Sequence, residues 1–237
     1  MKNIAVIFAG GTGTRMKSGT KPKQFLELHG KPIIIHTLEH FENHEQIDEI
    51  IVVCIDGWHD YLRSLLEKFT IKKVTKIVSG GNTGQMSIYN GLAAIEDVSD
   101  TAVLIHDGVR PLINRDIITR NIESVKAFGN AITTKPVIET VIQIDSEENI
   151  TNVVDRNSCM TAVAPQSFWL KDILEFHRLA QKENFYEAID SASLARKYGM
   201  ELKTVLGGPE NIKITTPSDF YIFRAIYEAR ENAQIFG

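Results

Sequence analysis

The chain has 237 residues, and its 26 Lys and Arg against 30 Asp and Glu give a formal charge of −4. A composition of 43% apolar and 24% charged residues is typical of a globular protein that buries a substantial core. The acidic balance argues against a protein whose main task is binding nucleic acid, because such proteins carry a basic surplus.

Cysteine content and hydropathy exclude further classes. Cys54 and Cys159 are too few and too far apart for a disulfide framework or a thiolate metal site. No segment approaches the roughly 18 apolar residues that a membrane span needs, and the apolar start at Ile4–Phe8 is too short for a signal peptide. We therefore expect a cytoplasmic protein with neither a membrane nor a nucleic-acid partner.

Short β-branched runs alternate with longer amphipathic runs in the first half of the chain. The runs that predict strands buried on both faces are Ile4–Phe8, Glu49–Ile55, Thr75–Ser79 and Ala102–His106. The runs that predict helices are Pro32–Phe41, Trp58–Phe69, Gln85–Ala94 and Arg115–Phe128. This alternation predicts an α/β fold with an open, mostly parallel, Rossmann-like sheet and helices on both faces.

This alternation of strand-like and helix-like runs breaks off in the second half of the chain. After a strand around Ala131–Lys135, two strand-like runs, Thr140–Ile144 and Ile150–Val154, flank a polar turn, which predicts an inserted β-hairpin. The elements expected after it are helices at Trp169–Lys182 and Asp190–Tyr198, a strand at Leu202–Leu206 and a helix from about Ser218. Because no Pro/Gly/Ser linker is present, we expect a single domain over 1–237 with a projecting β-arm at 138–158.

Three histidines recur at helical spacing in the first predicted helix. His36, His40 and His44 resemble a metal-binding face, but Glu39 and Glu42 accompany them. This composition favours a solvated polar face over a zinc site.

A glycine-rich loop follows the first strand directly, with the sequence Ala9-Gly10-Gly11-Thr12-Gly13-Thr14-Arg15-Met16. Glycines allow a tight turn and leave backbone N–H groups free to face phosphate oxygens. Arg15, Lys21 and Lys23 add positive charge, which suits a polyphosphate. The spacing fits neither a P-loop nor the dinucleotide fingerprint. A strand–helix turn with incidental charges is the alternative.

The fourth predicted strand ends in His106-Asp107-Gly108-Val109-Arg110-Pro111. Ligands of open parallel sheets bind beyond the carboxyl ends of the strands, so Asp107 is a candidate ligand of Mg²⁺. An Asp that caps a turn is the alternative. We expect His106 to be packed or to orient the loop.

Two further segments are candidates for binding. Gly80-Gly81-Asn82 and Ser87 follow the third strand and either approach a base or ribose or merely turn the chain. Near the end, Asn211–Thr215 reads as a short strand that presents Lys213, before a helix capped by Thr216 or Ser218.

Together these segments resemble one family, the cytidylyltransferases that act on polyol phosphates. The resemblance runs in order from residue 9 to residue 219 and also includes Pro22-Lys23-Gln24-Phe25, Asp155-Arg156-Asn157 and Ala164-Pro165-Gln166. It implies a nucleotidyltransferase sheet, a homodimer built through the β-arm, and transfer of CMP from CTP to a polyol phosphate with release of pyrophosphate. It also implies Mg²⁺ as the cofactor.

The resemblance implies a role for each matching residue. The triphosphate would be cradled by Ala9, Gly10, Gly11, Gly13, Arg15 and Lys23. Gly81 and Ser87 would lie by the cytidine, and Asp107 would meet both Mg²⁺ and the ribose or acceptor. The acceptor side would comprise Arg110, Asp190 and, from the partner subunit's arm, Arg156. Lys213 would stand at the reacting α-phosphate.

The acceptor is less sharply defined. Phe8 before the glycine loop and the run from Pro22 to Leu28 look like the ribitol-phosphate branch, whereas Val153-Val154-Asp155-Arg156-Asn157 resembles the methylerythritol-phosphate branch. Gly84 and Ile189 depart from an arginine and a threonine common in the family. We expect D-ribitol 5-phosphate, with 2-C-methyl-D-erythritol 4-phosphate and a non-catalytic nucleotide-binding dimer as the alternatives.

Overall fold

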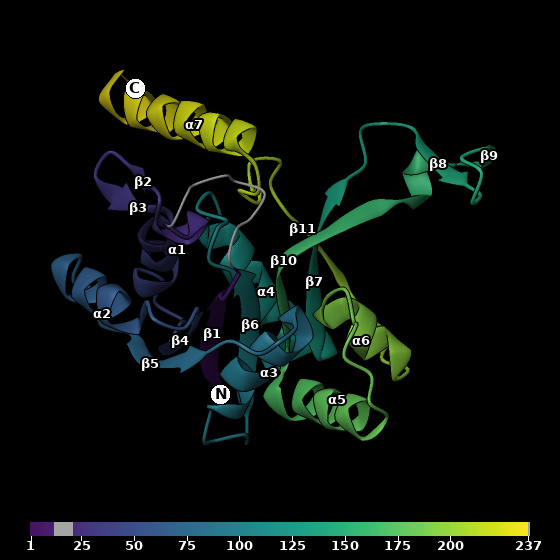
Figure 1. Cartoon of the computed structure of the whole chain (residues 1–237), viewed down its shortest axis with the longest axis horizontal. Helices are drawn as coiled ribbons and strands as arrows, with labels where there is room; N and C mark the ends of the chain where they lie inside the picture. Colours follow the sequence, from purple (N-terminus) through teal and green to yellow (C-terminus); the bar gives the residue numbers. More distant parts are fainter. Residues whose placement is uncertain (12–20, 237) are drawn as a thin grey trace.

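A computed structural model describes residues 1–11 and 21–236 of the chain. In this part of the chain, the central sheet has seven strands in the order β11-β7-β10-β6-β1-β4-β5 (Figure 1). Their bounds are β1 Lys2–Ala9, β4 Glu49–Cys54, β5 Val74–Ser79, β6 Thr101–Asp107, β7 Asn130–Pro136, β10 Met160–Trp169 and β11 Thr204–Leu206. All neighbours pair in parallel except β10, which is antiparallel to β6 and β7. The predicted open, mostly parallel sheet is confirmed.

Helices cover both faces of the sheet. One layer consists of α1 (Ile33–Glu42), α2 (His59–Lys68) and α4 (Arg115–Phe128). The other consists of α3 (Gly84–Ala93), α5 (Leu170–Lys182) and α6 (Ser191–Lys197). Ala5 and Ile7 of β1 pack with the first layer, and Ile4 and Val6 with the second. Because successive side chains of a strand point to opposite faces, a doubly covered strand has to be apolar throughout.

α3 approaches the sheet so closely at Gly91 that a side chain would not fit there. A Cβ at Gly91 would lie 2.6 Å from Cγ1 of Val6 and 2.7 Å from Cγ2 of Val53. These separations are far inside van der Waals contact, so Gly91 allows α3 to lie directly on β1 and β4. The close packing places the start of α3 beside the end of β1.

β10 has no counterpart among the predicted elements. Pro165 lies inside it, and proline, which lacks an N–H donor, argues against a central strand. The strand accommodates this residue where its pairing with β7 shifts register, between Ala162 and Gln166. There the Thr133 hydroxyl donates a hydrogen bond of 2.6 Å to the Pro165 carbonyl.

The C-terminal segment differs from the prediction in one respect. Residues 211–215 are irregular and form no strand, although Ile214 N donates a hydrogen bond of 2.9 Å to Val109 O. α7 (Pro217–Phe236) begins as predicted after Thr216, whose N–H donates to the Asp219 carboxylate at 2.7 Å. Over the described ranges, no helix combines the length and the apolar character needed to cross a membrane.

The prediction of a solvated histidine face on α1 is wrong. His36 and His44 are buried, at 4% and 1% exposure. Phe223 and Tyr227 of α7 pack edge-on against the His36 ring, with centroid distances of 5.3 and 5.0 Å. His44 lies just beyond the end of α1, and its Nε2 is 3.0 Å from Thr119 Oγ1 of α4. The local spacing of the histidines reveals neither neighbour.

The chain leaves the sheet between β7 and β10 as the predicted hairpin. β8 (Val141–Ile144) and β9 (Ile150–Val154) form a separate antiparallel pair that projects from the body of the molecule (Figure 1). The Asp145 side chain holds the turn by accepting hydrogen bonds of 2.9 Å from the N–H groups of Glu147 and Asn149. The remaining short elements are η2 (Lys23–Phe25), β2 (Glu27–Leu28), β3 (Lys31–Pro32) and η3 (Arg156–Ser158).

Candidate active site

A cavity of about 350 Å³ lies at the carboxyl end of β6. Open parallel sheets bind their ligands at this edge. Its wall combines residues from β1, α3, β6, α6 and the C-terminal segment, among them Phe8, Gln85, Asp107, Arg110, Asp190 and Lys213. Four residues that the sequence marked as candidates, Asp107, Arg110, Asp190 and Lys213, therefore line one cavity.

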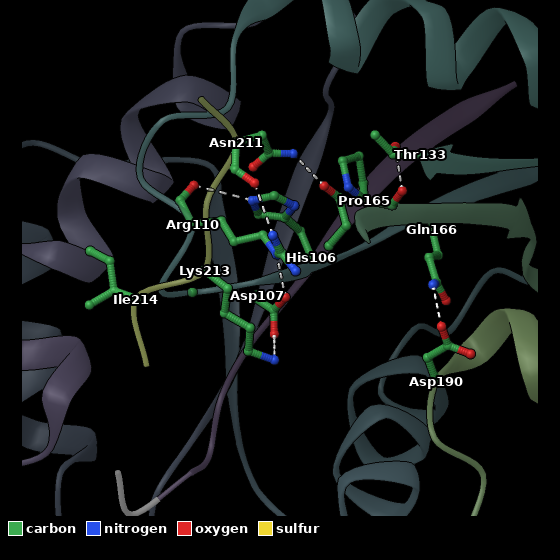
Figure 2. A network of polar contacts seen from close by, with 12 residues as sticks. His106, Asp107, Arg110, Thr133, Pro165, Gln166, Asp190, Asn211, Lys213 and Ile214 are labelled. Atoms are coloured by element: carbon green, nitrogen blue, oxygen red, sulfur yellow. Dashed lines mark hydrogen bonds and ion pairs between the residues drawn. The ribbon is translucent and has the colours of Figure 1, made fainter. Parts of the chain in front are cut away.

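Asp107 is the centre of a charged cluster. Its Oδ2 accepts a hydrogen bond of 2.6 Å from Arg110 Nε, and its Oδ1 lies 2.6 Å from Lys213 Nζ (Figure 2). Burial on its own would raise the pKa of Asp107, but the two neighbouring cations lower it to about 2. Asp107 is therefore a permanent anion at neutral pH.

Hydrogen bonds from side chains to backbone carbonyls fix the segment that carries Lys213 next to Arg110. Arg110 Nη1 donates a hydrogen bond of 3.0 Å to Asn211 O, and Asn211 Nδ2 donates one of 2.7 Å to Ala164 O (Figure 2). Lys23 Nζ donates a bond of 2.9 Å to Ile214 O. Thus the segment that carries Lys213 is fastened to the end of β6, to β10 and to the region after the glycine loop.

His106 packs into this corner as a neutral side chain. It is fully buried, and burial lowers its pKa to about 3, so the imidazole is neutral. Its Nε2 lies 3.4 Å from Arg110 O. The expectation of a packed or loop-orienting histidine is confirmed.

The two glycine segments meet at the end of β1. A Cβ on Gly10 would lie 3.7 Å from Cα of Gly80 and 3.8 Å from Oγ of Ser87. At Gly81 a Cβ would lie 2.5 Å from that of Met86, and Gly81 N donates a hydrogen bond of 3.0 Å to Ser87 Oγ. Gly81 has no room for a Cβ because the loop turns back on the start of α3, whereas the contacts of Gly10 are ordinary van der Waals contacts.

Comparison with known proteins now assigns the family. A family model described as IspD, 2-C-methyl-D-erythritol 4-phosphate cytidylyltransferase, matches residues 3–229. The chain belongs to the IspD family. This confirms the predicted resemblance and the predicted enzyme class, a cytidylyltransferase.

Individual relatives align with this chain over nearly their full length. The ribitol-5-phosphate cytidylyltransferase of Vibrio parahaemolyticus serotype O3:K6 is 57% identical over 99% of this chain and 100% of its own. The 2-C-methyl-D-erythritol 4-phosphate cytidylyltransferase of Syntrophus aciditrophicus is 36% identical over 97% of both chains. The solved 4-diphosphocytidyl-2C-methyl-D-erythritol synthase of Anaerococcus prevotii superposes with a TM-score of 0.83 at 27% identity, over 96% of both chains.

Not every predicted site residue of this IspD-family chain lies in the cavity. Arg156 belongs to η3 on the arm, where its Nη1 donates a hydrogen bond of 3.0 Å to Ile138 O. Ala9, Gly10 and Gly11 lie at the end of β1, and Ala9 O accepts a bond of 2.6 Å from Gln24 Nε2. Gly13 and Arg15 fall outside the described residues.

Asp190 has a structural task that the prediction did not include. It caps α6, its Oδ1 accepting a hydrogen bond of 2.8 Å from Ser193 N. Its Oδ2 accepts one of 2.7 Å from Gln166 Nε2 (Figure 2). A carboxylate has further lone pairs, so capping leaves room for a ligand.

Two buried glutamines shape the cavity and were missed as site residues. Gln166 also accepts a hydrogen bond of 2.9 Å from Ala192 N, which ties β10 to the start of α6. Gln85 donates to Phe185 O at 2.9 Å and accepts from Ala188 N at 3.0 Å. Gln166 belongs to the Ala164-Pro165-Gln166 motif of the family resemblance, so the sequence contained a signal for it. Nothing in the sequence predicts that Gln85 bonds to Phe185, which is about a hundred residues away.

Proposed function

We propose that this IspD-family enzyme transfers CMP from CTP to D-ribitol 5-phosphate, forming CDP-ribitol and pyrophosphate. The observation that carries the proposal is the cavity in which Lys213, Asp107 and Arg110 converge. The choice of acceptor is supported by 57% identity to a relative named as a ribitol-5-phosphate cytidylyltransferase, against 36% to one named for methylerythritol phosphate.

The reaction is an in-line displacement at the α-phosphorus of CTP. An oxygen of the acceptor phosphate forms the new P–O bond, and the bond to the bridging oxygen breaks, so that pyrophosphate leaves with the electron pair. A phosphate monoester is already ionised near neutral pH, because its second pKa is about 6. No general base is needed, so positioning and fixed positive charge supply most of the acceleration.

The chain's own residues divide this work. Lys213 would donate hydrogen bonds to the α-phosphate oxygens, where negative charge accumulates. Lys23 and Arg15 would neutralise the departing pyrophosphate, and the backbone of Ala9, Gly10, Gly11 and Gly13 would cradle the triphosphate. Gly81 and Ser87 would lie along the cytidine.

The acceptor side would be bound from three directions. Arg110 and Asp190 line the cavity. Arg156 would reach the acceptor phosphate from the arm of a partner subunit. This arrangement makes the site dependent on two chains.

Asp107 fits a divalent cation that arrives with the nucleotide. It is the buried, ionised carboxylate of the cavity, and in the part of the chain that the structure describes no three His, Cys, Asp or Glu side chains are grouped as a metal cage. Mg²⁺ commonly uses one or two carboxylates together with phosphate oxygens and water. When bound, it would neutralise charge on the triphosphate.

The arm supports a homodimer. Residues that face each other across an antiparallel pair point to the same side, and the register pairs Ile142 with Val153 and Ile144 with Ile150. All four are 46–62% exposed. An isolated two-stranded hairpin is at best marginally stable in water, and exposed apolar patches mark interfaces. We infer that residues 138–158 form a dimerisation arm of a single domain spanning 1–237.

The test is release of pyrophosphate from CTP with a panel of polyol phosphates. We expect turnover with ribitol 5-phosphate and little with 2-C-methyl-D-erythritol 4-phosphate. Turnover with methylerythritol phosphate alone would overturn the acceptor, and CTP binding without turnover on any acceptor would favour a non-catalytic nucleotide-binding dimer.

A further inference from the structure

An aromatic side chain shares the cavity wall with the charged cluster. Phe8 of β1 lines the cavity, and its register partner on β6 is Asp107. Residues that face each other on neighbouring strands point to the same side of a sheet. Phe8 packs with the core beneath α3, α5 and α6, the layer that also supplies Gln85 and Leu194 to the cavity. The reaction as proposed leaves this aromatic ring without a role.

The ammonium group of Lys213 lies over the Phe8 ring. Lys213 Nζ is 5.9 Å from the ring centroid and 2.6 Å from Asp107 Oδ1. An ammonium group within about 6 Å of the face of an aromatic ring is attracted by the quadrupole of the ring. Two residues on adjacent strands, one anionic and one aromatic, therefore attract the same ammonium group.

Lys213 depends on such neighbours for the position of its charge. It belongs to the irregular segment 211–215, and its side chain is 41% exposed. The backbone beside it is fixed, because Ile214 N donates a hydrogen bond of 2.9 Å to Val109 O. A lysine side chain, however, is a flexible four-carbon stem that ends in a point charge. The fold thus fixes the base of this side chain, and the neighbours of the ammonium group have to fix its tip.

The ring and the carboxylate restrain the ammonium group in different ways. A carboxylate takes up N–H donors, and in the proposed function Asp107 would also serve the divalent cation. An aromatic ring attracts a cation through its face and has no lone pair that takes up a donor. Phe8 would therefore orient Lys213 while its N–H groups stay available to phosphate oxygens, including when a metal ion competes for Asp107.

We propose that Phe8 is a positioning residue, whose ring holds the Lys213 ammonium group at the place where the α-phosphate of CTP reacts. This rests on the proposed function, because it concerns the lysine assigned there to the reacting phosphate. Phe8 acts through Lys213 and needs no contact with the reacting atoms. Its loss should therefore lower kcat and have little effect on KM.

A double-mutant cycle tests whether Phe8 acts through Lys213. Phe8→Leu keeps an apolar side chain but removes the ring, and we expect kcat for pyrophosphate release to fall about three- to tenfold, with little change in KM for CTP. In a chain that already carries Lys213→Ala, the same change should lower kcat by less than about twofold. Phe8→Tyr keeps an aromatic face and should retain most of the activity.

Fluorination of the ring separates its electrostatic effect from its packing. Mono-, di- and trifluorinated phenylalanine at position 8 nearly keep the shape of the ring, while each fluorine withdraws electron density from its face. We expect kcat to fall stepwise with the number of fluorine atoms, and the unfolding temperature to stay nearly constant. This series tests the proposal even if Phe8→Leu folds poorly.

Phe128→Leu is the matched control. Lys203 Nζ lies 5.5 Å from the centroid of the Phe128 ring at the end of α4, and Phe128 is 60% exposed. The substitution removes a cation–π contact of the same kind at the surface, so turnover should be unchanged. Thermal unfolding of each variant measures the purely structural cost.

The outcomes distinguish this inference from the proposed function. The positioning role is overturned, and the proposed function stands, if Phe8→Leu leaves kcat unchanged, if it lowers kcat by the same factor with and without Lys213, or if fluorination has no effect. If Lys213→Ala turns over CTP as fast as the wild type, or the wild type uses no acceptor, both proposals fail. If the wild type uses only another polyol phosphate, the proposed acceptor is wrong, and the same cycle with the active acceptor tests Phe8.

Discussion

Asp107 holds two cations that differ in exposure. The Arg110 side chain is 10% exposed, whereas that of Lys213 is 41% exposed. A buried ion pair cannot be broken cheaply, because the remaining charge is left without water, but an exposed cation is readily resolvated. The same carboxylate therefore anchors a structural arginine and a lysine that is free to turn towards a ligand.

The first prediction concerns Lys213. In Lys213→Ala we expect the rate of pyrophosphate release to fall by about 10²–10³, since a fixed positive charge at the reacting phosphate is lost. Stability should change by less than about 1 kcal/mol, because Asp107 keeps Arg110. Lys197→Ala, which removes an exposed lysine of α6, is the matched control. Early melting of Lys213→Ala with normal turnover per folded molecule would contradict the catalytic role.

The second prediction concerns Arg110, whose replacement should cost far more stability than the replacement of Lys213. Arg110→Met should lower the free energy of unfolding by about 3 kcal/mol or more, because Asp107 is buried and would keep only the exposed lysine. Urea unfolding measures this loss. Arg224→Met, which breaks an exposed ion pair of α7, should cost less than about 1 kcal/mol. Equal losses in the two variants would refute the anchoring role of Arg110.

At the scale of elements, the arm has two chemically different faces. Ile142, Ile144, Ile150 and Val153 share one face, whereas Gln143 and Asn152 pair on the other through a side-chain hydrogen bond of 3.1 Å. Because the apolar face is exposed in one chain, a second copy is the occupant that fits the proposed shared site.

The arm prediction follows from this asymmetry. Ile142→Lys should convert a dimer to a monomer and reduce turnover, because a charge at the centre of the apolar face opposes its burial. Gln143→Lys puts the same charge on the polar face and should leave the dimer intact. Sedimentation of both variants decides the matter, and an Ile142→Lys protein that remains dimeric would show that another surface joins the subunits.

For the whole molecule, buried neutral histidines set the pH dependence of stability. Burial lowers the pKa of His36 and His177 to about 4 and that of His106 to about 3. An unfolded histidine titrates near 6.5, so below that pH the unfolded chain binds more protons and the folded state loses stability as pH falls.

We expect the free energy of unfolding to fall between pH 7 and pH 5 by about 1–2 kcal/mol for each such histidine. Urea unfolding at the two pH values measures the loss. His36→Gln removes one titrating group, so its loss should be smaller than that of the wild type. A free energy that is flat over this range would contradict the burial of these rings.

The sequence predicted many of the residues that form the site but few of the contacts between them. Asp107, Arg110 and Lys213 were candidates because of their places after strands and in motifs, yet only folding joins segments 101 positions apart, as in the bond from Arg110 to Asn211. The dual use of Asp190 as a helix cap and cavity residue depends on neighbours that no local pattern specifies.

The sequence alone determined the features that local chemistry controls. Apolar runs of strand length, amphipathic runs of helix length and the polar turn at 145–149 placed most elements, because each depends on residues adjacent in the chain. Tertiary structure decided what depends on distant partners. It placed β10 in the sheet despite Pro165, covered His36 of α1 with α7, and brought Lys213 to Asp107. The reason is physical: burial and ion pairing are set by what packs against a residue, and packing is a property of the whole fold.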